Sequence, residues 1–384
     1  MHKTKQGAYM RIRSDYEVFT EAVQWAARNI ASNPAKPILG GILLQASSDG
    51  TLKLSSHDPE IGAEVEISVV TEEEGTCVVN GKLLAQYAKA LPHKEIILDS
   101  TSGLLEISCG TSKLSMGILP EEDYPKKPEM PSLAGTVDGA LWQEAVAQVA
   151  PAASNDDTLP LLVSICIEID GSNISLLATD RYRLAVRELE WEPKDSNIKA
   201  RILVRGSRLL DVTKSFTSVG KVEIFTDQDS NMIGFHVGGR YNTIRLFDGE
   251  YPEVRSLFPQ ENKDFVSFNT KDMLSAIARA SLVTEKNDSL KLDFSNNQVE
   301  LGAGNTASNT STNEILNANI HGEDITLAFS PQYLRDALKS INSDWARIYY
   351  TIPSKPAVIV AQNGEDGDTN EVFRLLQMPV RIYN

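Results

Sequence analysis

The chain has 384 residues, of which 41% are hydrophobic and 23% are charged, and its formal net charge at pH 7 is −15. This length exceeds one ordinary hydrophobic core and predicts roughly two to four domains of a globular, cytoplasmic protein. No apolar run approaches the roughly 20 residues of a membrane-spanning helix, so no membrane partner is expected. The negative charge also argues against a typical nucleic-acid-binding protein, because such proteins are usually basic.

Residues that commonly hold cofactors are few and scattered. Cys77, Cys109 and Cys166 are too few for a disulfide framework and are predicted to be small buried side chains in a reducing compartment. The five histidines show no helical or short-loop pairing, so we expect no metal site and no cofactor.

In chain order, residues 1–9 lack the apolar core of a secretory signal and are predicted to be a disordered N-terminal extension. Six amphipathic segments follow, and they are predicted helices in two sets of three. The first set is 17–31, 140–153 and 270–284; the second set is 80–91, 205–216 and 330–341. Leucines shared by the second set, Leu84, Leu210 and Leu334, lie about 125 residues apart.

Predicted strands recur between these helices in the same order. Paired strands with a polar turn between them are expected at 42–46 and 51–55, 165–169 and 173–177, and 290–294 and 299–301; single strands are expected at 95–99, 221–226 and 346–351. A period near 125 residues that occurs three times predicts an α+β fold with three tandem copies of one domain. Proline-rich linkers at 125–131 and 251–259 place the domains at 10–130, 131–258 and 259–384.

The second set of helices is basic although the chain is acidic. Residues 80–94, 205–216 and 330–341 together carry a net charge of +6, which leaves −21 on the rest of the chain. A solvated helix face would explain one such helix. Recurrence in three copies favours a shared surface that contacts nucleic-acid phosphates independently of sequence.

The central segment 176–187 is predicted to be a hairpin with a turn at Thr179 and Asp180. The alternating pattern places Tyr182, Leu184 and Val186 on one face and Arg181, Arg183 and Arg187 on the other. On pattern alone this is an ordinary sheet edge protected by charges. The alternative is a recognition hairpin that carries three arginines beside an aromatic ring.

Nothing in the sequence assembles a catalytic motif. A phosphate-binding loop and a nucleophile elbow are both missing, and Gly302-Ala-Gly304 is too short for a dinucleotide site. We therefore expect a non-enzymatic protein. Two alternatives stay open: a hydrolase or transferase with a site near Asp180 and Arg183, and a peptide-binding adaptor.

Several motifs together resemble the bacterial DNA polymerase III β subunit family, the sliding clamps. They are Pro37-Ile-Leu-Gly40 with Leu43-Leu44, Tyr124-Pro125, Ala178-Thr-Asp-Arg-Tyr-Arg-Leu-Ala185, Asp248-Gly-Glu-Tyr-Pro252 and Gln377-Met-Pro-Val-Arg-Ile382. The resemblance implies a processivity factor, in which two chains join head to tail as a six-domain ring around double-stranded DNA. It also implies a peptide groove between domains two and three for the DNA polymerase III alpha subunit, the clamp loader, other polymerases and repair proteins.

The resemblance assigns residues to three surfaces. The groove would contain Leu162, Thr179, Arg181, Tyr182, Arg183, Leu184, Pro252, Leu257, Tyr333, Ser354, Pro356, Leu376, Met378, Pro379, Val380 and Arg381. Of these, Arg183 and Arg381 would bind peptide carbonyls or acids, or else brace the groove. The DNA-facing surface would contain Lys36, Lys82, Lys89, Arg205, Arg208, Lys214, Arg279, Arg335 and Lys339. The dimer interface would join Leu114 and Met116 of one chain to Leu282 and Val283 of the other.

This chain departs from the family pattern at three places. Arg181-Tyr182 stands where the family often has Gly-His, which suggests altered partner motifs. Residues 305–313 are neutral where some members carry acids at the ring interface, and the loop at 33–36 lacks the arginine often found there, leaving Lys36 as the nearer candidate.

Overall fold

The computed structural model describes residues 9–30, 34–126, 129–216, 220–227, 230–259, 264–285, 288–305 and 310–381. Predictions for residues 1–8, 31–33, 306–309 and 382 lie outside these ranges. The chain divides into two compact units, Met1–Gly139 with Lys214–Leu246 and Ala140–Thr213 with Phe247–Asn384. We call them unit 1 and unit 2 and describe each by itself.

Unit 1 consists of antiparallel strands with two helices, α1 (Tyr16–Ala27) and α2 (Gly81–Ala90). Its N-terminal strands are β1 (Arg11–Ser14), β2 (Gly41–Ala46), β3 (Thr51–His57), β4 (Ile61–Ser68), β5 (Val70–Glu73), β6 (Gly75–Asn80), β7 (Ile96–Asp99), β8 (Leu104–Cys109) and β9 (Ser112–Leu119). Strand β4 pairs with β18 (Arg240–Phe247), and the sheet continues through β17 (Met232–Val237), β16 (Lys221–Phe225) and β10 (Leu133–Asp138). Pairing of β4 with β18 therefore joins parts of the first and second sequence repeats in one unit.

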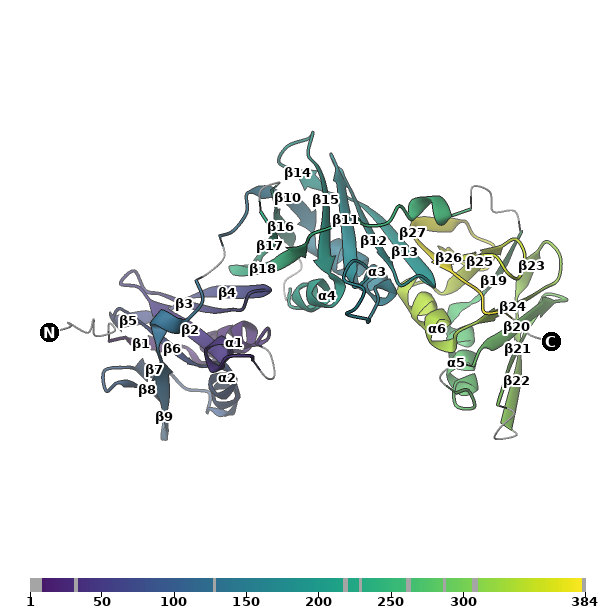
Figure 1. Ribbon diagram of the computed structural model, residues 1–384. Helices are drawn as coiled ribbons and strands as arrows, with labels where there is room; N and C mark the ends of the chain where they lie inside the picture. The colour runs from purple at the N-terminus through teal and green to yellow at the C-terminus, as the bar shows by residue number, and fades with distance from the viewer. Residues whose placement is uncertain are drawn as a thin grey trace. The chain divides into compact units, whose positions relative to one another are not determined.

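Unit 2 contains α3 (Gly139–Val149), most of α4 (Gly206–Lys214), α5 (Thr270–Ala280) and α6 (Pro331–Ser340). Its long antiparallel sheet runs in the order β15 (Lys199–Arg205), β11 (Ser164–Asp170), β12 (Asn173–Thr179), β13 (Arg183–Glu190), β27 (Thr369–Gln377), β26 (Ala357–Gln362), β25 (Trp345–Tyr350), β19 (Asp264–Asn269) and β23 (Asn319–His321). Helices α3, α4 and α6 lie below this sheet in Figure 1. A second sheet has the order β22 (Thr310–Asn317), β21 (Gln298–Asn305), β20 (Leu290–Ser295) and β24 (Ile325–Phe329).

The six predicted helices and the strand pairs between them are all present, with ends that shift by a few residues. The second helix of each copy begins at Gly81, Gly206 or Pro331, so equivalent positions can be compared directly. The fourth position is a fully buried leucine in each: Leu84, Leu209 and Leu334. The sequence alignment of Leu210 was therefore wrong by one residue, because Leu209 and Leu210 are adjacent and only the former faces the core.

Equivalent polar contacts also join the two helices of the first and second copies. Thr20 Oγ1 donates to the carbonyl of Ala88 (3.4 Å), and Gln143 Nε2 donates to the carbonyl of Thr213 (3.1 Å). Ala88 and Thr213 both occupy the eighth position of their helices. The repeat is thus visible in side-chain contacts of the first two copies as well as in element order. No helix in the described residues is long and apolar enough to cross a membrane.

Candidate functional site

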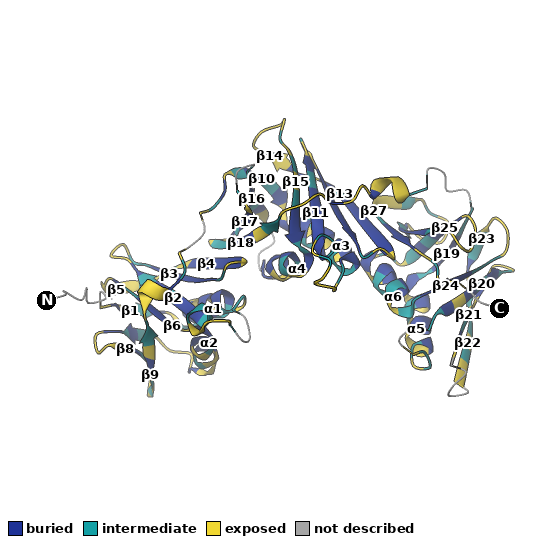
Figure 2. Ribbon diagram, in the orientation of Figure 1, coloured by how far each residue is buried: buried dark blue, intermediate teal, exposed yellow. Residues whose placement is uncertain are grey.

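The predicted groove residues come from six segments, two of which, β13 and β27, pair in the long sheet of unit 2. Strand β13 is not a sheet edge, because it pairs with β12 on one side and with β27 on the other. Arg183 stands opposite Gln377, and Leu184 stands opposite Leu376. The simple interpretation of this hairpin as a charged edge was therefore wrong; Figure 2 shows β13 as a mainly buried strand.

The β12–β13 turn is fixed by two short polar side chains, as the sequence predicts. Asp180 Oδ1 accepts hydrogen bonds from the backbone N–H groups of Tyr182 and Arg183, both at 3.0 Å. Thr179 Oγ1 donates to the carbonyl of Arg183 (2.7 Å) and accepts from the N–H of Arg181 (3.2 Å). The turn leaves Arg181 in the left-handed region, with φ of 80°. The second strand consequently begins at Arg183 and not at Arg181.

Arg183 is buried and braces the hairpin against α6. Its Nε donates to Asp180 Oδ2 (3.0 Å), and its Nη1 donates to Asp336 Oδ2 of α6 (2.9 Å). The guanidinium also lies 4.3 Å from the ring centroid of Tyr333. Because two carboxylates already neutralise this arginine, it holds the hairpin against α6 and is not free to bind a further acid. Asp180 is likewise fully engaged within the turn, which is the arrangement of a structural residue.

The apolar groove residues separate into a buried floor and an accessible surface. Leu184 and Leu376 belong to a core cluster with Leu177, Tyr251 and Val254. Burial raises the pKa of the Tyr251 hydroxyl, which accepts a hydrogen bond from the N–H of Thr179 (3.0 Å). Thr179, Arg183, Leu184 and Leu376 are thus buried and support the surface from beneath.

The accessible surface lies above this floor. Tyr182, Leu257, Met378 and Val380 are large side chains with exposed fractions of 54%, 56%, 38% and 39%. The other predicted groove residues are exposed or half-buried: Leu162, Arg181, Pro252, Tyr333, Ser354, Pro356, Pro379 and Arg381. Burial and the nearby Asp180 carboxylate raise the pKa of Tyr333. The hairpin and the C-terminal segment are held together here, since the N–H of Met378 donates to the carbonyl of Tyr182 (2.8 Å).

Gln377 is a polar residue of this region that the sequence-based groove omitted. Its side chain is fully buried beside Arg183 and Ala357, its strand partners. Neither its amide nitrogen nor its amide oxygen has a hydrogen-bond partner in the described part of the chain. The available signal was a lone glutamine that follows two buried leucines in a strand.

The predicted DNA-facing cations differ in whether they form ion pairs or hydrogen bonds with other residues of the same chain. Arg205 pairs with Asp157, Arg279 pairs with Glu314, and Arg335 Nη2 donates to Ser281 Oγ (2.7 Å). Lys89, Lys214 and Lys339 are exposed and occupy the ninth position of α2, α4 and α6. These three lysines form no ion pair with any residue in the described ranges. Of the remaining candidates, Lys36 is exposed, and Lys82 and Arg208 are half-buried.

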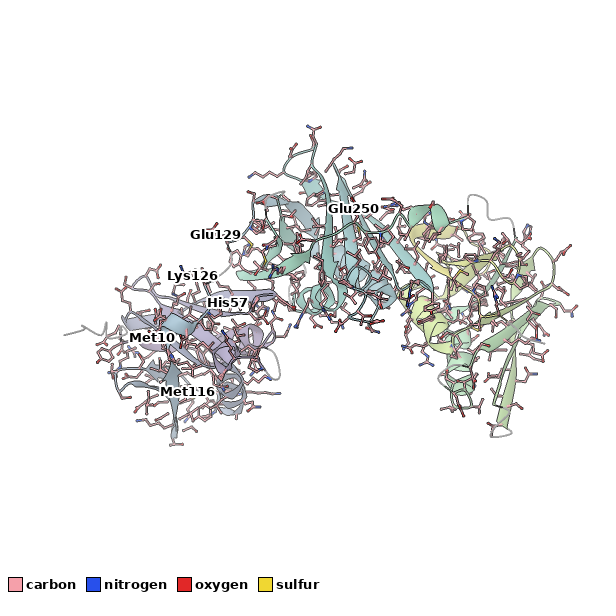
Figure 3. All side chains as sticks on the ribbon, in the orientation of Figure 1. Met10, His57, Met116, Lys126, Glu129 and Glu250 are labelled. Atoms are coloured by element: carbon pink, nitrogen blue, oxygen red, sulfur yellow. The ribbon has the colours of Figure 1, made fainter. Side chains whose placement is uncertain are left out.

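The predicted dimer-interface residues also differ in how far their side chains are exposed. Leu282 is 84% exposed, whereas Leu114 and Val283 are half-buried. Met116, labelled in Figure 3, packs in the core of unit 1 and is only 5% exposed, so it is not available for an intermolecular contact. Strand β22 pairs only with β21 among the described strands, and it carries Ile315, which is 62% exposed and which the sequence analysis missed.

The described residues contain no group of three or more His, Cys, Asp or Glu side chains that could hold a metal ion. Cys77, Cys109 and Cys166 are buried, as predicted. Burial raises the pKa of the Cys77 thiol to about 12 and that of the Cys166 thiol to about 11. These two thiols stay protonated near neutral pH and are poor nucleophiles.

Three family models match the chain in tandem. They describe the N-terminal, central and C-terminal domains of the DNA polymerase III beta subunit and match residues 10–128, 136–253 and 255–379. The beta sliding clamp of Streptomyces coelicolor is 39% identical over 97% of this chain and 100% of its own length. The beta sliding clamp homolog GriR of Streptomyces muensis is 36% identical with the same coverage.

Solved structures have the same fold. The DNA polymerase sliding clamp of Bacillus subtilis has a TM-score of 0.89 at 26% identity, covering 98% of this chain and 100% of its own. The sliding clamp of Pseudomonas aeruginosa bound to griselimycin has a TM-score of 0.88 at 22% identity, with the same coverage, and supports the fold alone.

Proposed function

Because this chain belongs to the DNA polymerase III beta subunit family, the beta sliding clamps, and is a DNA polymerase processivity factor, we propose that it acts as a non-catalytic homodimeric ring. Two chains join head to tail in the cytoplasm and enclose double-stranded DNA. The observation that carries this proposal is the tandem match of three clamp-domain models across residues 10–379.

The basic positions on the second helices support contact with DNA. Lys89, Lys214 and Lys339 recur at one helical position, and each is exposed and unpaired with acids of the described chain. Such lysines attract phosphates without reading bases. The net charge of −15 keeps the overall affinity for DNA low. We therefore infer that enclosure retains the protein on DNA, while the lysines permit sliding.

Two open strand edges support a head-to-tail dimer. Strand β22 carries the exposed Ile315 at the edge of its sheet. Leu282 follows the end of α5, and α5 lies beside β22 because its Arg279 pairs with Glu314. In unit 1, β9 pairs with β8 over residues 112–117 and with β6 only at Ile118 and Leu119, so the other edge of residues 112–117 is unpaired by described strands. An unpaired edge is a template for another strand. We propose that β9 of one chain meets β22 of its partner, with Leu114 facing Leu282.

The accessible surface beside the β12–β13 hairpin supports a peptide-docking role. Leu257, Met378 and Val380 supply exposed apolar area, and Met side chains adapt to varied partners. We propose that this groove receives short linear segments of the DNA polymerase III alpha subunit, the clamp loader, other polymerases and repair proteins. Leu and Phe side chains of the peptide would supply the anchors.

Binding of a fluorescent peptide of the type Gln-x-x-Leu-x-Phe tests the groove. We expect Met378→Ala to weaken binding by about tenfold, because an anchor loses its contact surface. Val372→Ala is the matched control, since Val372 is a similarly exposed residue of β27 outside the groove. Equal affinity of both variants and the unmodified protein would show that the peptide does not occupy this surface.

A further inference from the structure

Arg181 has a backbone conformation that is unfavourable for every residue with a Cβ atom. Its φ of 80° lies in the left-handed region, where the Cβ atom of an L-residue approaches the following carbonyl oxygen. Glycine adopts this conformation without that clash. A large charged residue in such a position is often kept for a function and not for stability.

The guanidinium of Arg181 is presented from a rigid turn at the rim of the groove. The Arg181 N–H is bonded to Thr179, and the next two N–H groups are bonded to Asp180. The Arg181 side chain is exposed, and its Cζ atom lies 6.0 Å from the ring centroid of Tyr182. The Tyr182 ring in turn lies 6.3 Å from that of Tyr333, so Arg181 borders an aromatic pair on the accessible surface.

Arg181 is also the available cation of this hairpin. Arg183 is buried between two carboxylates, whereas Arg181 forms no ion pair with any acid in the described ranges. Asp156 is the nearby acid: hydrogen bonds from Thr158 lower its pKa, and Arg181 contributes a smaller electrostatic effect. Asp156 Oδ1 is bonded to the N–H and hydroxyl of Thr158. The guanidinium of Arg181 donates no hydrogen bond to any residue in the described ranges, so its five N–H donors are open to another acceptor.

We propose that Arg181 makes the groove selective for peptides that carry an aspartate or glutamate beside their apolar anchors. The carboxylate would accept hydrogen bonds from the guanidinium while the Leu and Phe side chains occupy the apolar surface. The proposal rests on the peptide-docking role given above. An exposed ion pair of this kind favours the acidic peptide by about twofold to fivefold at low salt, and salt screening reduces the preference.

Two otherwise identical fluorescent peptides test this selectivity. Both have the form Gln-x-x-Leu-x-Phe, with Asp at the two positions before Leu in one and Asn in the other. Dissociation constants are measured by anisotropy at low and high salt for the full-length protein and for Arg181→Gly and Arg181→Lys. We expect the unmodified protein and Arg181→Lys to prefer the Asp peptide, and Arg181→Gly to bind both peptides with the affinity of the Asn peptide.

The melting temperature separates selectivity from folding. Arg181→Gly should melt no lower than the unmodified protein, because glycine relieves the left-handed strain. An unchanged preference for the Asp peptide in Arg181→Gly, or no preference in the unmodified protein, would overturn the role of Arg181 while leaving the groove intact. Failure of both peptides to bind the unmodified protein would overturn the groove and this inference together.

Discussion

At the scale of single residues, two fully buried glutamines in the C-terminal copy differ in whether their amides are satisfied. Gln362 Oε1 accepts from Arg347 Nε (2.9 Å), and its Nε2 donates to the carbonyls of Gly364 (2.9 Å) and Glu365 (2.6 Å). Gln377 has no such partners in the described chain. A buried polar group without a partner is destabilising, whereas removal of a satisfied one leaves its partners unpaired.

Methionine substitutions at these two sites should therefore change stability in opposite directions. We expect Gln377→Met to raise the free energy of unfolding by about 1–2 kcal/mol, because it removes the unpaired amide and conserves side-chain shape. Gln362→Met should lower it by about 1–3 kcal/mol, because three polar groups lose their partner. Urea denaturation monitored by circular dichroism measures both changes. A loss of stability in Gln377→Met would mean that its amide is satisfied in solution.

At the scale of secondary structure, the second helices present the same cation three times. Each lysine at the ninth position neutralises at most one phosphate, and each such contact adds about 0.9 to the slope of log affinity against log salt. The triple variant Lys89→Gln, Lys214→Gln and Lys339→Gln should therefore bind a short duplex more weakly, with a shallower salt dependence. Fluorescence anisotropy over a salt series measures both quantities.

A matched triple variant controls for net charge. Lys194→Gln, Lys199→Gln and Lys291→Gln removes the same number of exposed lysines, and none of these lies on a helix or on the strands β9 and β22 of the proposed dimer interface. If the two triple variants weaken DNA binding equally, the effect would come from total charge and not from the positions on the helices.

The helices and the repeat were predictable because their signals are local. Apolar periodicity and polar caps such as Asn80, whose Oδ1 accepts from the N–H of Leu83 (2.9 Å), lie within a few residues of the structure they specify. The burial of the hairpin, in contrast, depends on residues that are distant in the sequence. Burial of β13 requires β27 from the far end of the chain, and the charge of Arg183 is neutralised by Asp336 from another sequence repeat.

Membership of the groove stays a prediction, and the sequence could not say which of its residues are buried and which are exposed. Strand alternation placed Tyr182 with Leu184 and Val186, yet the Asp180 turn absorbs residues 181 and 182, so Tyr182 stays exposed while Leu184 is buried. Both faces of β13 are covered. On one face Arg187 approaches Glu144 of α3 (3.8 Å) and Arg183 reaches α6; on the other, Leu184 and Val186 belong to a buried core cluster. The alternating pattern therefore predicted which face of the strand each side chain is on, but it did not predict which side chains are buried.

At the scale of the whole molecule, the ring requires a contact between two chains, and substitution of an exposed leucine tests that contact. Leu282→Glu places a charge on a side chain that is 84% exposed in the single chain and that we assign to the dimer interface. We expect the unmodified protein to elute as a dimer in size-exclusion chromatography with light scattering, and this variant as a monomer. Val372→Glu, at a 45% exposed site outside the proposed interface, should stay dimeric. A dimeric Leu282→Glu would place the interface elsewhere.

Enclosure of DNA is the central claim, and retention on closed and open DNA tests it most directly. The protein is loaded by a bacterial clamp loader onto a nicked circular plasmid, and gel filtration separates bound from free protein before and after one restriction cut. The ring account predicts retention on the circle and release from the linear form, because a closed ring slides off an end. Equal retention on circular and linear DNA would contradict enclosure and favour an adaptor that binds DNA through its surface.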